Sequence, residues 1–201
     1  MQRLLIAVCI LGFVNPLLRA QSLTADDLKA GVAYLEETRA AVIAATRDLS
    51  PEQWNFKTAP ERWSVAEVTE HLAASEDFLM GMIQGQVMKA PPRSEPTDVR
   101  AIDDFVRKTI PDRSSKFKAP EPLIPSNRFR TPTESLQHFK ASRAKTVTFL
   151  TETKDAREHA MDSPLGKKLD VYQWVLFIGA HSERHTKQIV EVKSDPGFPK
   201  K

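Results

Sequence analysis

Hydrophobic residues recur every three to four positions along four long stretches of this chain, which is the spacing of one buried face of an α-helix. The stretches cover residues 24–49, 64–87, 131–153 and 170–193. Only seven glycines are present, and the fourteen prolines cluster between the stretches rather than inside them. The pattern therefore predicts four long helices joined by stiff loops, rather than a sheet protein.

Polar residues mark where these helices should begin. Thr24 and Asp27 have the spacing of a capping box, in which the side chain of each residue satisfies the backbone N–H of the other, and Ser64 and Glu67 repeat it. Asp170 stands directly before the last apolar stretch and is expected to cap it.

Two of the connections carry information about the topology. Ser50 and Pro51 open a short helical turn with Trp54 and Phe56, which we expect to close one end of a bundle. The connection over 90–130 holds half of the prolines and one predicted helix, from Asp98 to Ile110. Adjacent antiparallel helices need only a few linking residues, so this length favours a crossover that makes the second and third long helices parallel.

Residues 1–20 differ in kind from the rest of the chain. Arg3 precedes an apolar run from Leu4 to Val14, and a candidate cleavage position follows Ala20. This order is typical of a secretory signal peptide, and the run is too short to cross a bilayer. We expect export to the periplasm or the extracellular space, no stable membrane anchor, and a single domain over residues 21–201.

Composition narrows the partners and the chemistry. Signal cleavage would remove Arg3 and Arg19 and no acidic residue, which lowers the formal net charge from +3 to +1. Without a basic stripe, we expect no nucleic-acid partner. The only cysteine, Cys9, lies in the predicted signal peptide. The mature chain would then lack a thiol nucleophile and a thiolate metal site, so nitrogen and oxygen atoms must hold any metal ion.

Three of the five histidines are placed to meet. His181 and His185 lie four residues apart, so they share one helix face, where the pattern calls for apolar residues. His71 lies roughly 10 Å from the start of its helix, and the pair lies roughly 12 and 18 Å from the end of theirs, at 1.5 Å per residue. Antiparallel packing of these two helices, which the crossover requires, brings the three imidazoles to one level.

Three neutral imidazole nitrogens with open coordination positions form the catalytic type of metal site. We therefore predict a divalent metal ion at His71, His181 and His185, with zinc as the first candidate and nickel or another transition metal as alternatives. A metal-free alternative stays open, because each histidine could instead be a core residue bonded to a carbonyl group. The helix does not carry the H-E-x-x-H pattern of zinc proteases, since Ser182 follows the first histidine.

Two other polar residues could belong to the same site. Glu67 lies four residues before His71 and could orient its ring, although it is also the capping-box glutamate. Gln188 lies three residues after His185 and could reach the metal pocket as a supporting group or merely flank the core. The residues that we expect to be solvated at the surface are His138, His159, Glu152, Lys154 and Arg157.

The chain also resembles a known family. The run from Pro60 to Leu72, the long crossover and His181-x-x-x-His185 followed by Gln188 are similar to the DinB-like superfamily of small bacterial four-helix bundles, named for the damage-inducible DinB. The likeness covers about residues 25–192. It implies an all-α, up-down-down-up four-helix bundle, with a divalent metal ion held by the three histidines identified above.

The resemblance is a better guide to the fold of this chain than to its function. Relatives of this type include metal-dependent thiol transferases and isomerases, and many others have no known activity. Because small thiols are scarce outside the cytoplasm, export makes hydrolysis by metal-bound water an alternative to thiol transfer. We expect an exported metal-dependent hydrolase or thiol transferase with an unknown small-molecule substrate. The alternative is a non-catalytic metal- or ligand-binding bundle, and a homodimer stays open.

Overall fold

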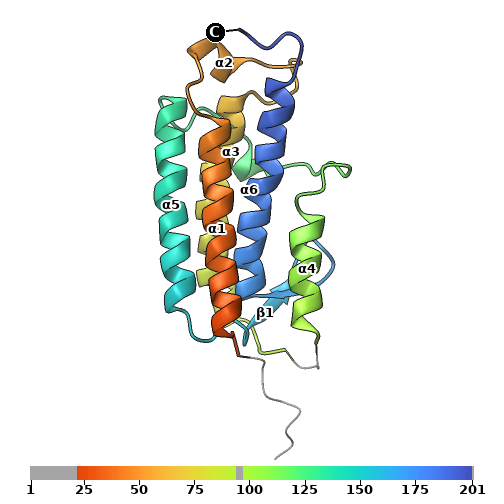
Figure 1. Cartoon of the computed structure of the whole chain (residues 1–201). Coiled ribbons are helices and arrows are strands. Elements are labelled where there is room, and N and C mark those ends of the chain that lie inside the picture. Colours follow the sequence, from red (N-terminus) through yellow and green to blue (C-terminus); the bar gives the residue numbers. More distant parts are fainter. Residues whose placement is uncertain (1–21, 94–96, 201) are drawn as a thin grey trace, which may run out of the picture.

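Four long helices pack side by side in the computed structural model, which describes residues 22–93 and 97–200 (Figure 1). They are α1 (Ala25–Ala45), α3 (Val65–Gly85), α5 (Pro132–Glu152) and α6 (Val171–Lys193). Helices α1 and α3 each pack against both α5 and α6. Helices α1 and α6 run in one direction, and α3 and α5 run in the other (Figure 1). The predicted all-α four-helix bundle with up-down-down-up order is confirmed.

Shorter elements complete the fold. They are α2 (Pro51–Asn55), η2 (Val87–Lys89), α4 (Val99–Thr109), η3 (Glu121–Leu123), β1 (Ala160–Asp162) and β2 (Lys168–Asp170). Helix α4 packs on α6, outside the four long helices. The two strands pair antiparallel, with Met161 opposite Leu169. This hairpin was not predicted, because strands of three residues are too short to show a period of two.

The predicted capping boxes start the helices as expected. Thr24 Oγ1 accepts a hydrogen bond from the backbone N–H of Asp27 at 3.1 Å, and Ser64 Oγ accepts one from Glu67 at 3.2 Å. The end of α1 differs from the prediction, which continued the helix to Leu49. The helix ends at Ala45, and Asp48 adopts a left-handed backbone conformation with φ of 54°.

The interior holds a charged pair among the apolar side chains. Arg143 of α5 is fully buried and Glu76 of α3 is 2% exposed. Arg143 donates from Nε and Nη2 to the two carboxylate oxygens of Glu76, at 2.7 and 2.9 Å. It also donates to the carbonyl oxygen of Leu35 and to the hydroxyl groups of Thr38 and Ser182. One side chain therefore links all four long helices.

Arg157 corrects the expectation of a solvated charge. Its side chain is buried, and it donates to both carboxylate oxygens of Asp103 in α4, at 2.8 and 2.6 Å. It also donates to Asp170, the cap of α6, at 3.2 Å. The sequence pattern does not show this burial, because Asp103 precedes Arg157 by 54 residues.

The described part of the chain contains no helix with both the length and the apolar character needed to cross a membrane. The predicted signal peptide, residues 1–20, lies outside the described residues. Export and the cleavage position therefore stay predictions from the sequence.

Candidate metal centre

The three predicted histidines converge between α3 and α6. Nε2 of His181 lies 3.2 Å from Nε2 of His71 and 3.1 Å from Nε2 of His185. One ring nitrogen from each histidine lies within 4.8 Å of the other two. The two helices run antiparallel (Figure 1). This is the direction that the prediction of three imidazoles at one level requires.

The outer ring nitrogens of two histidines face oxygen acceptors. Nδ1 of His71 lies 2.8 Å from the carbonyl oxygen of Leu123, which can only accept, so Nδ1 carries the hydrogen. Nδ1 of His185 lies 2.8 Å from Oε1 of Gln188. Arg113, which can only donate, approaches the same oxygen at 3.5 Å and supports its assignment as the acceptor. Both rings therefore present an unprotonated Nε2 toward His181.

Burial keeps the cluster neutral. His71 and His185 are 3% and 8% exposed, and His181 is half-buried. Burial lowers the pKa of His71, and it holds the pKa values of His181 and His185 well below the usual histidine value. The neighbouring imidazoles add to the effect for the pair on α6. Neutral imidazole is the form that binds a metal ion.

Aromatic rings lie against the cluster. The ring centre of Trp63 lies 4.9 Å from that of His71 and 6.4 Å from that of His185. Phe177, one turn before His181 on α6, stacks on it with a centre separation of 6.5 Å. These rings exclude water from the flanks of the cluster, which strengthens electrostatic interactions there.

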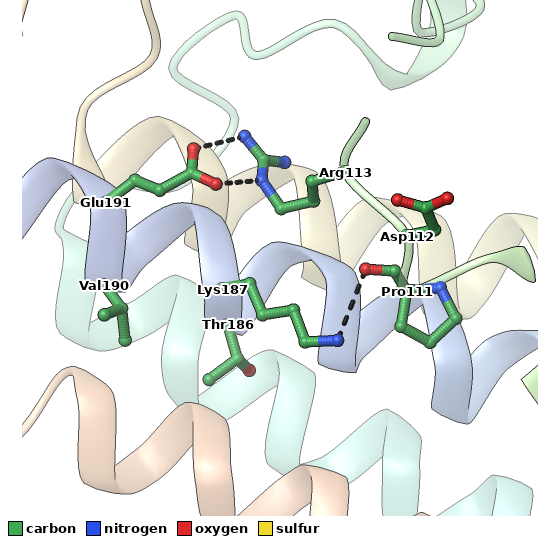
Figure 2. A pocket seen from close by; sticks show the side chains of 7 residues that line it. All are labelled: Pro111, Asp112, Arg113, Thr186, Lys187, Val190 and Glu191. Atoms are coloured by element: carbon green, nitrogen blue, oxygen red, sulfur yellow. Dashed lines mark hydrogen bonds and ion pairs between the residues drawn. The ribbon is translucent and has the colours of Figure 1, made fainter. Parts of the chain in front are cut away.

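Two hollows lie near the histidines, and neither is lined by a histidine itself. The smaller one, of about 190 Å³, shares Trp63 and Gln188 with the surroundings of the cluster. Its other lining residues are Thr58, Arg62, Glu191, Val192 and Asp195. The larger one, of about 500 Å³, lies where α6 meets the chain after α4 (Figure 2). Its lining residues are Pro111, Asp112, Arg113, Thr186, Lys187, Val190 and Glu191.

Glu67 is not placed beside the ring of His71, which corrects one of its two predicted roles. One carboxylate oxygen accepts from the backbone N–H of Ser64 at 2.8 Å, and the other accepts from Lys57 Nζ at 2.7 Å. The outer nitrogen of His71 bonds to Leu123 instead. Glu67 thus has the capping role, because a side chain committed to the helix start cannot also reach a ring one turn later.

The remaining two histidines lie apart from the cluster. His138 is exposed, as predicted, and its Nε2 lies 2.6 Å from a carboxylate oxygen of Asp77. His159, expected at the surface, is only partly exposed, and its Nδ1 lies 2.6 Å from the carbonyl oxygen of Ala90. Each ring has a local partner that accounts for its position.

Leu123 and Arg113 are neighbours of the site that no sequence pattern identified. Leu123 acts through its backbone carbonyl group, which every residue type carries, so no sequence signal could identify it. Arg113 lies in the long connection, whose path over the bundle is set by tertiary contacts. The ligand side chains were therefore predictable from the sequence, whereas the groups that orient them were not.

Comparisons with known proteins agree with this architecture. The sequence profile of the DinB superfamily matches residues 34–189. The uncharacterized protein YuaE of Bacillus subtilis (strain 168) is 28% identical over 163 residues, which cover 81% of this chain and 96% of YuaE. The structure of YfiT from Bacillus subtilis, described as a probable metal-dependent hydrolase with an unusual four-helix bundle topology, superposes with a TM-score of 0.60. It shares 16% identity and covers 89% of this chain and 93% of YfiT. The profile match spans most of the chain, which therefore belongs to the DinB superfamily.

Proposed function

We propose that this protein binds a divalent metal ion through Nε2 of His71, His181 and His185 and acts as a metal-dependent hydrolase. The convergence of the three nitrogens carries the proposal. Ligand nitrogens about 2.0–2.1 Å from a tetrahedral zinc ion lie roughly 3.3 Å from one another. The observed separations of 3.1 and 3.2 Å are close to this value. Zinc is the first candidate for the ion.

The metal-free alternative leaves the cluster poorly satisfied. A hydrogen on Nε2 of His181 can be donated to His71 or to His185, but not to both. The other donor near His71 is Ser75, whose Oγ lies 3.4 Å from Nε2, longer than a well-formed hydrogen bond. A buried acceptor without a donor costs about 1–3 kcal/mol. A divalent cation would satisfy all three nitrogens at once.

Three protein ligands would leave coordination positions for water and substrate, which supports an enzyme over a closed structural site. A bound divalent ion in such a site lowers the pKa of water or polarises a substrate oxygen. The description of YfiT as a probable metal-dependent hydrolase supports hydrolysis here too. Thiol transfer and non-catalytic binding remain the competing functions.

One hollow beside the cluster has room for a small group. The hollow beside Trp63 and Gln188 measures about 190 Å³, below the roughly 300–1,000 Å³ of sites that enclose drug-sized ligands. Trp63 offers an aromatic face, and Arg62 on the rim is exposed. A small substrate group in this hollow would contact Trp63 and Arg62.

Metal analysis of the purified mature protein tests the first half of the proposal. We expect one divalent ion per chain and a rise in melting temperature on adding zinc to chelator-treated protein. No bound ion and no thermal shift with zinc, nickel or manganese would exclude the metal centre. The metal-loaded protein should then hydrolyse members of an ester, amide and phosphoester panel. Turnover only in the presence of a thiol would favour the transferase.

We further propose that the working protein is exported and begins at Gln21. The support is the charged and apolar pattern of residues 1–20. N-terminal sequencing of protein from the native cells, after separation of cytoplasm and periplasm, tests this. A chain that retains Met1 and stays in the cytoplasm would contradict it.

A further inference from the structure

The chain between α4 and α5, residues 110–130 and here called the connector, contacts both helices that carry the histidines. Its regular structure is limited to the short turn η3. Leu123 in this turn supplies the carbonyl oxygen that faces His71. A segment with so little secondary structure needs other contacts to hold one carbonyl group in place.

Glu70, the residue before His71 on α3, holds the second half of the connector. Its two carboxylate oxygens accept from the backbone N–H groups of Ser126 at 2.6 Å and of Asn127 at 3.1 Å. Glu70 is 7% exposed, so this carboxylate is largely removed from water and is stabilised by these donors and by Arg128, whose Nε lies 3.7 Å from Oε1. Asn127 has a φ of 62°, in the left-handed region, which asparagine tolerates better than most residues.

Arg184, the residue before His185 on α6, holds the first half. Its guanidinium donates from Nη1 to the carbonyl oxygen of Ile110 at 3.1 Å and also to that of Asp112. From Nη2 it donates to the carbonyl oxygen of Ser115 at 2.5 Å. Arg184 is 8% exposed, so these carbonyl groups replace much of the water that a free guanidinium would bind.

The first half of the connector reaches His185 through two side chains. Arg113 donates to both carboxylate oxygens of Glu191, at 2.6 and 2.7 Å (Figure 2). Its Nη1 lies 3.5 Å from Oε1 of Gln188, the oxygen that faces Nδ1 of His185. The same stretch is tied to α6 by Lys187, whose Nζ lies 3.4 Å from the carbonyl oxygen of Pro111 (Figure 2).

The two halves of the connector are held to the histidine helices in the same way. In each half, a charged residue directly precedes a histidine and binds backbone groups of the connector. The connector in turn supplies or supports the acceptor for Nδ1 of that histidine. Successive helix residues point about 100° apart, so Glu70 and Arg184 face the connector while the histidines face each other. Neither charged residue has a contact with a histidine nitrogen among the described residues, so both act at a distance from the ligand atoms.

We propose that Glu70 and Arg184 are positioning residues, which clamp the connector so that it fixes the hydrogen of His71 and of His185 on Nδ1 and leaves Nε2 free. Partners of this kind, which hold a metal-ligating histidine through its other nitrogen, typically change metal affinity by about 10–100-fold. The effect on metal affinity rests on the proposed function. The effect on the ring hydrogens does not, because it concerns the metal-free protein.

The test uses Glu70→Gln, which keeps the shape but loses one strong acceptor, and Arg184→Lys, which keeps the charge but loses the planar fork. Glu134→Gln is the matched control for the first, since Glu134 also accepts a connector N–H, from Arg130 at 2.9 Å. Arg39→Lys, on the surface of α1, controls for the second. All proteins carry ¹⁵N-labelled histidine and are studied at pH 8 in chelator.

The ¹⁵N shifts of the ring nitrogens report which nitrogen carries the hydrogen, and a purely structural role would not change them. We expect Nδ1–H for His71 and His185 in the parent and both controls. Glu70→Gln should add the Nε2–H form of His71, and Arg184→Lys should add that of His185. Zinc affinity, from competition with a chelator, should fall about 10-fold or more in each variant.

Unchanged ring shifts in both folded variants would overturn the proposal, even if zinc affinity fell. If the ring shifts change in the variants as expected but the parent binds no zinc, the positioning role is supported and the proposed metal centre is contradicted instead. If one variant fails to fold, the other tests the opposite half of the connector. Equal changes in the Glu134→Gln control would also count against the specific role of Glu70.

Discussion

Nε2 of His181 lies 3.2 Å from Nε2 of His71, although the two residues are 110 positions apart in the chain. The contact depends on the antiparallel packing of α3 and α6, which in turn depends on the long crossover before α5. The bundle has buried apolar side chains on all four long helices, so its fold should not depend on a metal ion. The effect of losing a metal ligand can therefore be measured on a chain that is still folded.

Replacing His181 or His185 by alanine should abolish metal binding while the fold persists. In the parent, free zinc at about 100 times the Kd adds about 2.7 kcal/mol to the free energy of unfolding. We expect the parent to melt at a higher temperature with zinc than in chelator, and each variant to melt at the same temperature in both. His138→Ala is the control and should keep the zinc response. A zinc response lost in His138→Ala and kept in His71→Ala would contradict the assigned ligands.

Stability of the metal-free protein should fall as the pH drops below about 6.5. The folded-state pKa values of His181 and His185 lie well below the unfolded value, mainly because of burial. Between the folded and unfolded pKa values the unfolded chain binds more protons, so acid favours unfolding, by up to about 1.4 kcal/mol per pH unit for each histidine. Urea unfolding in chelator from pH 8 to pH 5 measures this. The slope should be shallower in His185→Ala, and an equal slope would contradict the prediction.

Breaking the buried pair of Arg143 and Glu76 should destabilise the bundle strongly. Arg143→Met leaves the Glu76 carboxylate buried without its cation, and we expect a loss of about 3–5 kcal/mol in urea unfolding. The double variant Arg143→Met/Glu76→Leu should regain most of it. Thr146 donates to Glu76 at 2.8 Å in the parent. In the double variant, the hydroxyl groups of Thr38, Thr146 and Ser182 can donate to carbonyl groups of their own helices, at 2.9, 3.2 and 3.3 Å. A double variant no more stable than Arg143→Met would show that the pair is needed for more than charge balance.

Two helical glycines should respond in opposite ways to alanine. A Cβ at Gly31 on α1 would stand 2.7 Å from Cε2 of Tyr172 and 3.1 Å from Cδ2 of Leu150. Tyr172 cannot move freely, because its hydroxyl donates to the carbonyl oxygen of Asp27 at 2.7 Å, so Gly31→Ala should cost about 1–3 kcal/mol. Gly81 on α3 has open space around it, and Gly81→Ala should stabilise by up to about 1 kcal/mol. Thermal unfolding of both variants measures the difference, and stabilisation by Gly31→Ala would contradict the close packing of α1 and α6.

Local signals in the sequence determined the helices and the candidate ligands. Capping boxes such as Ser64 with Glu67 involve residues three apart, and the shared face of His181 and His185 follows from a spacing of four. These relationships hold within one or two helical turns, where backbone geometry alone fixes the distances. The same geometry predicts the position of His71 along the bundle axis, once the crossover defines the direction of each helix.

The tertiary structure alone decided which charges are buried and what orients the ligand rings. Arg157 lies among charged residues such as Lys154 and Glu158, which predicts a solvated side chain, and its pairing with Asp103 and Asp170 in the folded chain makes its burial favourable. The acceptor for His71 is a backbone carbonyl group, at Leu123, which residue type does not reveal. The connector that holds it has almost no periodic structure, so its path depends on long-range contacts such as the one between Glu70 and Ser126. Interactions between distant residues, unlike those within a helix, have no fixed spacing that a sequence could display.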